Sequence, residues 1–272
     1  MDRRGAGSAD HHADARITPF ADRRETLAPV FFQQRRAPGG FERRLATIVK
    51  AGRSPVGFSL DVVVHNLPYL LAAARWTLLV SLTGMGISLV LGTGICAARI
   101  SGNIGFQAFG RLYISFFRGV PLLVQLLMFY YMLPHVGLDL PATAAAILAT
   151  GMCSAAYTAE ILRGALRAIP NGQTEAAWAL GIPGVALWRR ILVPQAVRIG
   201  LPSMVNELIL LVKVSSLASV VGIAELTHVS QNIASETYRP LEIYVATAMI
   251  YLVVNFALSR VGRLAEKRLR IG

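Results

Sequence analysis

The residues able to do chemistry in this chain are few, and they form no catalytic set. The histidines show no metal-ligand spacing, and no Ser/His/Asp, Cys/His or paired-carboxylate arrangement indicates membrane-enzyme chemistry. Residues 92–97 match the loose dinucleotide pattern GxGxxA, but no strand is expected before them and the surrounding stretch is apolar. A phosphate-binding loop needs Gly-Lys-Ser/Thr, and none of Lys50, Lys213 and Lys267 has that setting. We therefore expect no catalysis, no ATPase activity, and no metal or cofactor on this chain.

Polar side chains inside apolar segments are a second kind of candidate, because ionisable groups at membrane depth usually face a bundle interior or an aqueous cavity. Arg118 and Gln125 lie on either side of a Gly-Val-Pro sequence, and a structural role and a pathway role fit them equally. Asn206 and Lys213 are seven residues apart and share a helix face, whereas Glu207 lies roughly 120° from Lys213 on a regular helix. We expect no direct Glu207–Lys213 pair, and we interpret this segment as part of a pathway or subunit interface. A satisfied polar cluster is the alternative.

The most strongly patterned segment of the chain lies between two apolar stretches. It reads Glu-Ala-Ala-Trp-Ala-Leu-Gly over residues 175–181, and Ile-Leu-Val-Pro follows at 191–194. We expect Thr174 to cap the N-terminus of a helix of about two turns, Glu175 to lie at this end, where the helix dipole is positive, and Gly181 to end the helix. Such a helix is too short to be stable alone in water.

The same segment has the side chains of a docking surface. Ala176 and Ala177 leave the helix narrow enough to enter a groove, while Trp178 and Trp188 are large enough to anchor an interface. A second helix is expected to begin at Pro183-Gly184 and to end near Pro194. The alternative is an amphipathic helix that lies on the bilayer surface.

The composition places these candidates in a membrane protein. Of the 272 residues, 54% are hydrophobic and 15% are charged, and the mean hydropathy is +0.52. A soluble domain carries roughly 25% charged residues. Five apolar windows are near the length that crosses a bilayer as a helix, and with no water to bond the backbone each must be helical. The predicted spans are 76–98, 113–134, 140–162, 202–222 and 243–260.

The net charge of +12 is explained by membrane topology better than by nucleic acid. The arginines cluster at membrane edges, with no aromatic-interleaved groove, so we expect no nucleic-acid partner. The loops after the first and third spans and the C-terminal tail are basic, whereas the loop at 134–141 has no basic residue other than His135. By the positive-inside rule the C-terminus is cytoplasmic and the N-terminus is outside.

Residues 1–60 differ from the rest of the chain. They are rich in Arg, Ala, Pro and Gly, and no window is apolar enough to span a membrane or to form a signal-peptide core. We interpret them as a basic disordered tail that precedes a membrane domain at 61–272. This tail conflicts with an outside N-terminus, because about a dozen basic residues would have to cross the membrane.

Small residues in the predicted spans indicate close helix packing. The first span carries Gly84, Gly86, Gly92 and Gly94, at spacings that let membrane helices approach closely. Cys96 and Cys153 also lie within predicted spans and are expected to be small apolar packing residues.

Several motifs together resemble a known family. They cover about Leu67 to Leu269 and are the following: Phe117-Arg118-Gly119-x-Pro121-Leu-Leu-Val-Gln125, Tyr157-x-x-Glu160-x-x-Arg163-Gly164-Ala165, Ala168-Ile169-Pro170-x-Gly172-Gln173, Glu175-Ala176-Ala177-x3-Gly181-x9-Ile191-x-x-Pro194, Ser216-Leu217-Ala218-Ser219-Val220 and Tyr238-Arg239-Pro240-Leu241-Glu242-x-Tyr244. The chain resembles the integral-membrane permease subunits of bacterial ABC importers for polar amino acids, the histidine/glutamine permease type.

The resemblance implies a fold, a site and partners. The fold would be an all-α membrane protein of about five transmembrane helices with a cytoplasmic coupling-helix loop, the type I ABC importer permease. The residues that dock into a separate ATPase would be Glu175, Ala176, Ala177, Gly181, Ile191 and Pro194. The candidates for the pathway or subunit interface are Arg118, Gln125, Glu160, Asn206, Glu207, Lys213 and Ser216.

The implied machine is a multi-pass protein of the bacterial inner membrane, surrounded by lipid. ATP would be bound and hydrolysed by ATP-binding cassette subunits, a second permease copy or paralogue would complete the pathway, and an extracytoplasmic solute-binding protein would deliver a polar amino acid. The alternatives are an importer of the same type for an opine- or ectoine-like solute, an ion-coupled secondary transporter or channel using Glu207 and Lys213, and, weakest, an intramembrane enzyme.

Overall fold

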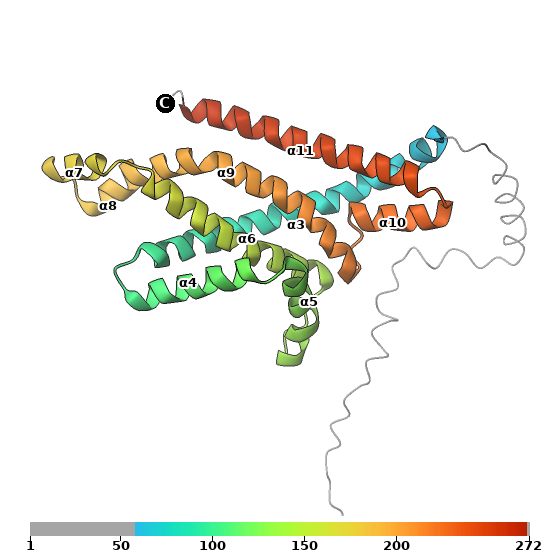
Figure 1. The fold of residues 1–272 in the computed structure, drawn as a ribbon, viewed down its shortest axis with the longest axis horizontal. Helices are drawn as coiled ribbons and strands as arrows, with labels where there is room; N and C mark the ends of the chain where they lie inside the picture. The colour runs from blue at the N-terminus through green and yellow to red at the C-terminus, as the bar shows by residue number, and fades with distance from the viewer. Residues whose placement is uncertain (1–57, 271–272) are drawn as a thin grey trace, which may run out of the picture. The chain divides into compact units, whose positions relative to one another are not determined.

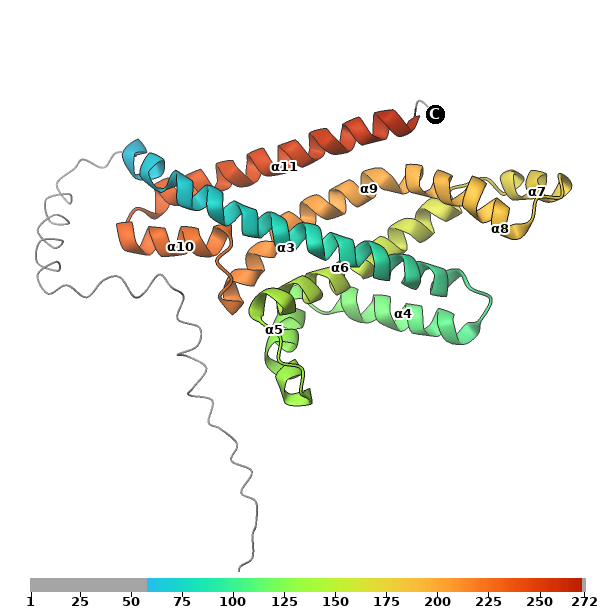
Figure 2. The same cartoon turned by 180° about the vertical axis from the view of Figure 1, so that it is seen from behind.

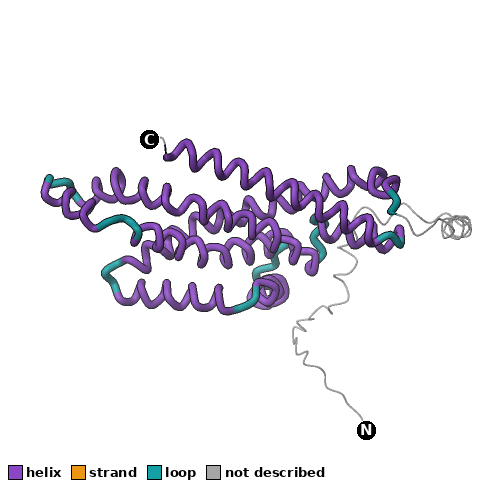
Figure 3. Tube along the Cα trace, turned by 45° about the horizontal axis from the view of Figure 1, so that its top comes forward, coloured by secondary structure: helices purple, strands orange, loops and turns teal. Residues whose placement is uncertain are grey.

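The computed structural model of the protein describes residues 58–270, with side chains as far as residue 268. The expectation for the tail at 1–60 therefore lies outside the described residues, apart from its last positions. The described part is helical throughout, apart from short connections (Figures 1 and 3). Its elements are α3 (Leu60–Ile100), α4 (Ile104–Gly119), α5 (Leu122–Met132), the 3-10 helix η1 (Leu133–Val136), α6 (Ala142–Arg167), α7 (Asn171–Ala179), α8 (Gly184–Leu187), the π-helical turn η2 (Trp188–Leu192), α9 (Val193–Val214), the 3-10 helix η3 (Ser215–Val221), α10 (Leu226–Thr237) and α11 (Pro240–Arg270).

Helices α3 and α6 form the tightly packed centre of the bundle. A Cβ atom added at Gly84 would lie 2.9 Å from Thr150 Oγ1, and one added at Gly92 would lie 2.8 Å from Thr158 Cβ. The expected packing role is therefore confirmed for these two glycines. At Gly86 and Gly94 an added Cβ meets nothing within 4 Å, so these two glycines do not pack against another of the described helices. Glycines eight residues apart share one face of α3, and that face is the one turned to α6.

The membrane spans follow the prediction in number more closely than in shape. Four helices of the described part are long and apolar enough to cross a membrane, and the count is five if α4, α5 and η1 together form one span. Helix α3 has 41 residues and begins at Leu60, so the segment that precedes the first predicted span is helical as well. It continues through Pro68 without ending. Helix α10 was not anticipated from the sequence.

The second predicted span, 113–134, is not one straight helix. Helix α4 ends at Gly119, and the chain bends by 103° before α5 and η1. The cause is local: Pro121 has no N–H to donate to the preceding turn, and its ring disfavours helical geometry at Val120. The bend places the C-terminal end of α4 and the start of α5 beside the middle of the bundle (Figure 1).

The loop after α6 contains the expected short helix, with different ends. Helix α7 begins at Asn171, directly after Pro170, so Thr174 lies inside the helix and does not cap it. Gly181 follows the helix at φ +69°, a conformation that glycine adopts without strain, and the expected stop is confirmed.

The second loop helix does not end near Pro194. Pro194 cannot donate to the carbonyl four residues earlier, and the chain forms the wider turn η2 there, in which the Val193 N–H bonds to the Trp188 carbonyl. Helix α9 then continues to Val214. A bent but unbroken helical segment, Gly184–Val221, thus joins the loop to the membrane core (Figure 2).

The described part has two distinct ends. Helices α7 and α8, the α3–α4 turn and the end of α11 lie at one end, and α10 and the start of α3 lie at the other (Figures 1 and 2). The basic residues that follow the first and third spans therefore gather with the C-terminus at one end.

Candidate functional site

A cavity of about 300 Å³ lies between the α4–α5 bend, α6 and α9. Its volume is at the lower end of the range for small-molecule sites, which begins at about 300 Å³. Most of its lining is apolar, and a few polar groups converge on it. The lining includes Arg118, Cys153, Ser154, Tyr157 and Glu207.

Arg118 supplies the positive charge of the cavity. It is the penultimate residue of α4, and its guanidinium carbon lies 5.2 Å from the centre of the Tyr157 ring on α6. The side chain is exposed, and among the described residues no acidic group lies within ion-pair distance of it. A planar guanidinium held over an aromatic ring and free of a carboxylate is well placed to bind one from a solute.

Glu207 supplies the negative charge. It is buried on α9, and its Oε1 accepts a 2.7 Å hydrogen bond from Ser154 Oγ. The network continues through Ser88, whose hydroxyl lies 3.1 Å from Ser154 Oγ and 2.7 Å from Thr158 Oγ1. Three helices therefore hold the carboxylate in place. Within the described residues no cation pairs with Glu207, and Lys213 in particular does not, as its angular position on α9 predicted.

Gln125 has a structural role at the bend. It is 1% exposed, and its Nε2 donates to the carbonyls of Phe117 (3.0 Å) and Val120 (2.7 Å). These are carbonyls that the break between α4 and α5 leaves without helical partners. Of the two roles left open for Gln125, the geometry supports the structural one, because the amide holds the bend that carries Arg118. Cys153 donates weakly to the same Phe117 carbonyl, at 3.5 Å, and packs with Cys96 in an apolar cluster as expected.

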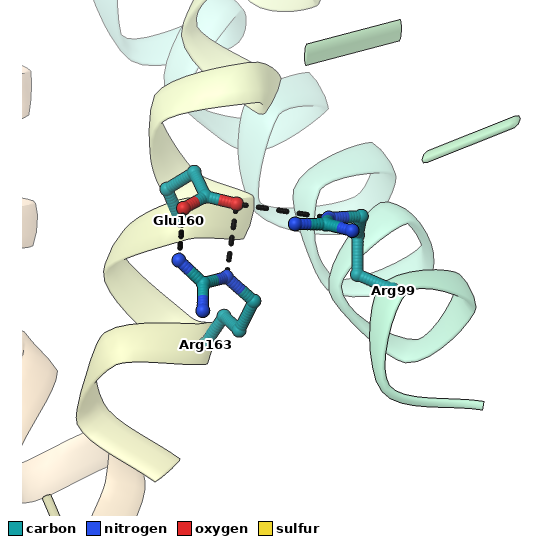
Figure 4. Close-up of polar contacts among 3 residues, drawn as sticks. All are labelled: Arg99, Glu160 and Arg163. Carbon is teal, nitrogen blue, oxygen red and sulfur yellow. Dashed lines mark hydrogen bonds and ion pairs between the residues drawn. The ribbon is translucent and has the colours of Figure 1, made fainter. Parts of the chain in front are cut away.

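Glu160 belongs to a separate charged group beside the cavity. It bonds to Arg163 on the same helix, at 3.0 Å from Nε to Oε1 and through a second bond from Nη2 to Oε2. Across the helix interface, Arg99 Nε of α3 lies 3.9 Å from Glu160 Oε1 (Figure 4).

The remaining pathway candidates lie on α9 and in the 3-10 helix η3 that follows it. Asn206 and Lys213 are both exposed, and no acidic partner of Lys213 occurs in the described part of the chain. Ser216 donates to the Lys213 carbonyl at 2.8 Å and contributes to the end of the helix. These residues do not line the cavity.

The loop residues form an exposed surface at one end of the molecule. Glu175, Ala176, Gly181 and Pro194 are exposed and Ile191 is half-buried, but Ala177 is only 2% exposed and packs inward. The large apolar side chains are strongly exposed, with Trp178 at 66% and Val185 at 81%. A shallow hollow lined by Val185, Trp188, Arg189 and Val193 lies next to them.

Sequence reasoning missed several of these residues. Ser154, Tyr157 and Ser88 are small or aromatic residues in apolar helices, and only the packing of α3, α6 and α9 shows what they contact. Arg99 was interpreted only as a residue at a membrane edge.

A bundle of candidate membrane-spanning helices, with an open cavity lined by charged residues and an exposed apolar loop at one end, is typical of a polytopic membrane transport component. The comparisons with known proteins give the family. Residues 90–271 match the model of the binding-protein-dependent transport system inner membrane component, and the chain belongs to that family.

Curated relatives and solved structures agree with the assignment. The chain is 35% identical over 211 residues to a probable amino-acid ABC transporter permease protein, YckA, of Bacillus subtilis (strain 168), covering 78% of this chain and 93% of that protein. It is 37% identical to the glutamine transport system permease protein GlnP of Escherichia coli (strain K12), with 79% and 99% covered. It is 39% identical to the octopine transport system permease protein OccM of Rhizobium meliloti, with 72% and 84% covered.

Among solved structures, an amino acid ABC transporter crystallised with histidines has a TM-score of 0.73 at 35% identity, and the match covers 79% of this chain and all of that one. The MetNI methionine ABC transporter in an inward-facing form has a TM-score of 0.63 at 20% identity, which shows the shared fold. The chain is thus a multi-pass inner-membrane component of a binding-protein-dependent transport system, with the all-α fold predicted from the sequence.

Proposed function

We propose that the cavity beside the α4–α5 bend binds the amino acid in transit, with Arg118 recognising its carboxylate and Glu207 a cationic group of the same solute. The observation that carries the proposal is the pair of opposite charges lining one cavity, neither with a charged partner among the described residues. A buried carboxylate without a counter-charge costs free energy, and a solute ammonium offsets that cost. A zwitterionic amino acid carries a charge complementary to each of the two groups.

Ligand analogues test this assignment on the purified complex of the permease with its ATPase. We expect L-glutamine, L-arginine or L-histidine to bind more tightly than the corresponding amide, which lacks the carboxylate. In Arg118→Gln this preference should disappear. An Arg118→Gln complex that still prefers the acid over the amide by the wild-type factor would contradict the role of Arg118.

The cationic arm is tested separately. Glu207→Gln should lose the preference for the free amine over the N-acetyl derivative if Glu207 binds the α-ammonium. If Glu207 instead binds a cationic side chain, the variant should lose only the preference for L-arginine over L-citrulline, which lacks the side-chain charge. Retention of both preferences would exclude Glu207 from recognition.

We also propose that α7 and the adjoining hollow are the docking surface for a separate ATP-binding cassette subunit, which binds and hydrolyses the ATP. Exposed Trp178, Leu180 and Val185 make an apolar patch that a partner would cover. Proteins similar to this chain are named as parts of ABC transporters, which supports a partner of this kind. Glu175→Lys or Gly181→Asp should leave the chain inserted while ATP hydrolysis no longer drives uptake into proteoliposomes. Wild-type uptake by both variants would contradict coupling. Labelling of Trp178→Cys by a bilayer-embedded reagent would instead favour a helix lying on the membrane.

In this proposal the loop and the C-terminus are cytoplasmic and the start of α3 is on the outer side, where a solute-binding protein delivers the amino acid. Exposed Lys213 and Asn206 lie within a membrane-spanning rod, and such groups face protein or water in preference to lipid. A second permease copy or a paralogue would enclose them. Disulfide crosslinking between subunits through Asn206→Cys tests that pairing.

A further inference from the structure

Two arginines, Arg99 and Arg163, gather around Glu160, and none of these three residues lines the cavity. The guanidinium groups of Arg99 and Arg163 both lie within ion-pair distance of the Glu160 carboxylate. Arg163 occupies both of its oxygens, and Arg99 approaches one of them. Arg118 has no ion pair among the described residues, but its guanidinium lies over the ring of Tyr157, which is one helical turn from Glu160 on the same face of α6.

The geometry of Arg99, Glu160 and Arg163 does not fit a purely structural role in holding α3 and α6 together. The two bonds from Arg163 lie within α6 and join nothing else (Figure 4). The one contact across the helix interface is 3.9 Å long, and the buried Arg99 Nε has no hydrogen-bond partner in the described part of the chain. The helix pair is already held together by close approaches at Gly84, Gly92 and Gly151.

The position of Arg99 is nevertheless built into the packing. A Cβ added at Gly110 of α4 would lie 2.8 Å from Arg99 Cγ, so the arginine stem runs under α4 only because residue 110 is glycine. Helix α4 thus holds Arg99 against Glu160 at one point and carries Arg118 at its far end. Movement of α4 relative to α6 changes both distances together.

We propose that Glu160 competes with the substrate carboxylate for Arg118, and that Arg99 and Arg163 hold Glu160 away while the solute is bound. This inference rests on the proposed function of the cavity. When α4 shifts during transport, Glu160 pairs with Arg118 and displaces the amino acid. Glu160 is a positioning residue of the release step, and Arg163 keeps Arg118 available for binding.

Opposite changes in affinity test the proposal. The purified permease–ATPase complex, without nucleotide, is titrated with L-glutamine, L-arginine and L-histidine. Glu160→Gln removes the competitor and should tighten binding about fivefold or more, the lower end of coupling between linked sites, while uptake into proteoliposomes slows. Arg163→Gln frees the competitor and should weaken binding by a similar factor.

The double variant Glu160→Gln/Arg163→Gln separates competition from structural damage. Without the carboxylate, loss of Arg163 should have no effect, and the double variant should bind as Glu160→Gln does. Arg167→Gln, which removes an exposed arginine one turn further along α6, is the matched control and should bind as wild type does.

Two results would overturn the proposal: Glu160→Gln that binds no more tightly than wild type, or a double variant that keeps the defect of Arg163→Gln. If Arg163→Gln does not fold, the first comparison alone decides. Failure of the proposed function gives a different pattern, because Arg118→Gln would then leave the acid-over-amide preference unchanged.

Discussion

Two buried glutamates of this permease have opposite surroundings. Glu225, between η3 and α10, is fully buried and accepts three hydrogen bonds, from the Thr227 N–H (2.9 Å), the His228 N–H (2.7 Å) and the Tyr251 hydroxyl (3.2 Å). Glu207 accepts one, from Ser154, and borders an open cavity. Both side chains are buried, but the described part of the protein donates three hydrogen bonds to the Glu225 carboxylate and only one to that of Glu207.

The difference separates a carboxylate whose hydrogen bonds the protein itself supplies from one that is proposed to bind a solute. Glu225 caps α10, and the neighbouring Leu226 N–H bonds to Thr77 Oγ1 at 3.1 Å, so the capped end is tied to α3. Every donor around Glu225 comes from the protein itself. The partly satisfied Glu207 leaves bonding capacity for a solute, and such incomplete sites are where ligands bind.

The largest effect is expected at the structural site. Glu225→Ala removes the cap and leaves buried donors unpaired, which together should cost about 2–4 kcal/mol of stability. The thermal unfolding midpoint of the detergent-solubilised chain should fall clearly. Glu236→Ala, at an exposed position of the same helix, is the control and should leave the midpoint unchanged. An equally small change in both variants would remove the contrast between the two glutamates.

Glu207→Gln should have the opposite profile. The stability should change little, because the amide oxygen still accepts from Ser154, whereas the affinity for a cationic amino acid should fall about 10- to 100-fold with the loss of a charge-assisted bond. The unfolding midpoint and equilibrium binding are measured on the same preparation. Unfolding of Glu207→Gln under conditions in which the wild type is folded would make Glu207 a structural residue like Glu225.

The face of α3 behind the Glu207 network is expected to tolerate no added methyl group. Gly92→Ala brings a Cβ to 2.8 Å from Thr158, a member of that network, and should cost about 1–3 kcal/mol through overpacking. Gly94→Ala, whose added Cβ meets nothing within 4 Å among the described residues, is the matched control. Equal stability of the two variants, measured by denaturant titration, would show that α3 and α6 are less tightly packed than described.

The smallest effect concerns pH. Burial raises the pKa of the Glu225 carboxyl, although its hydrogen bonds oppose the shift. A folded-state pKa above that of the unfolded chain means that the folded state binds the proton more tightly, so stability increases as pH falls through the folded-state pKa towards the unfolded value. The difference in unfolding midpoint between wild type and Glu225→Gln should change in that direction with pH. A pH-independent difference would mean that the pKa is unshifted.

The fold was predictable where one physical rule acts alone. The helical character of 140–162 and 243–260 follows from their apolar length, because the bilayer allows no other backbone arrangement for such windows. The bend at Val120–Pro121 combined two signals, an apolar run and a proline, and the prediction gave priority to the run. At Pro194 the prediction gave too much weight to the proline. A π-helical turn accommodates it, and the helix that was expected to end there continues.

The candidate site was predictable by residue type but not by contact. Arg118 and Glu207 were identified because charges are rare in membrane helices. Their shared cavity, and the division of Gln125 and Glu160 into other roles, depend on how α4 crosses α6, which no spacing along the chain records. Helix α10 has no apolar run that would predict it from the sequence. The burial of its capping residue Glu225 depends on the packing of α10 against α3 and α11, which only the structure shows.

The central claim is that the amino acid occupies the cavity beside the α4–α5 bend. The most direct measurement uses Leu210→Cys, an exposed position of the cavity lining, in a chain whose Cys96 and Cys153 are replaced by Ser. The rate of modification by a charged thiol reagent is compared with and without saturating amino acid in the permease–ATPase complex. The account predicts clear slowing of Leu210→Cys and no change at Leu241→Cys, an exposed position of α11 that does not line the cavity. Equal modification of Leu210→Cys with and without the amino acid, under conditions in which the amino acid demonstrably binds, would contradict it.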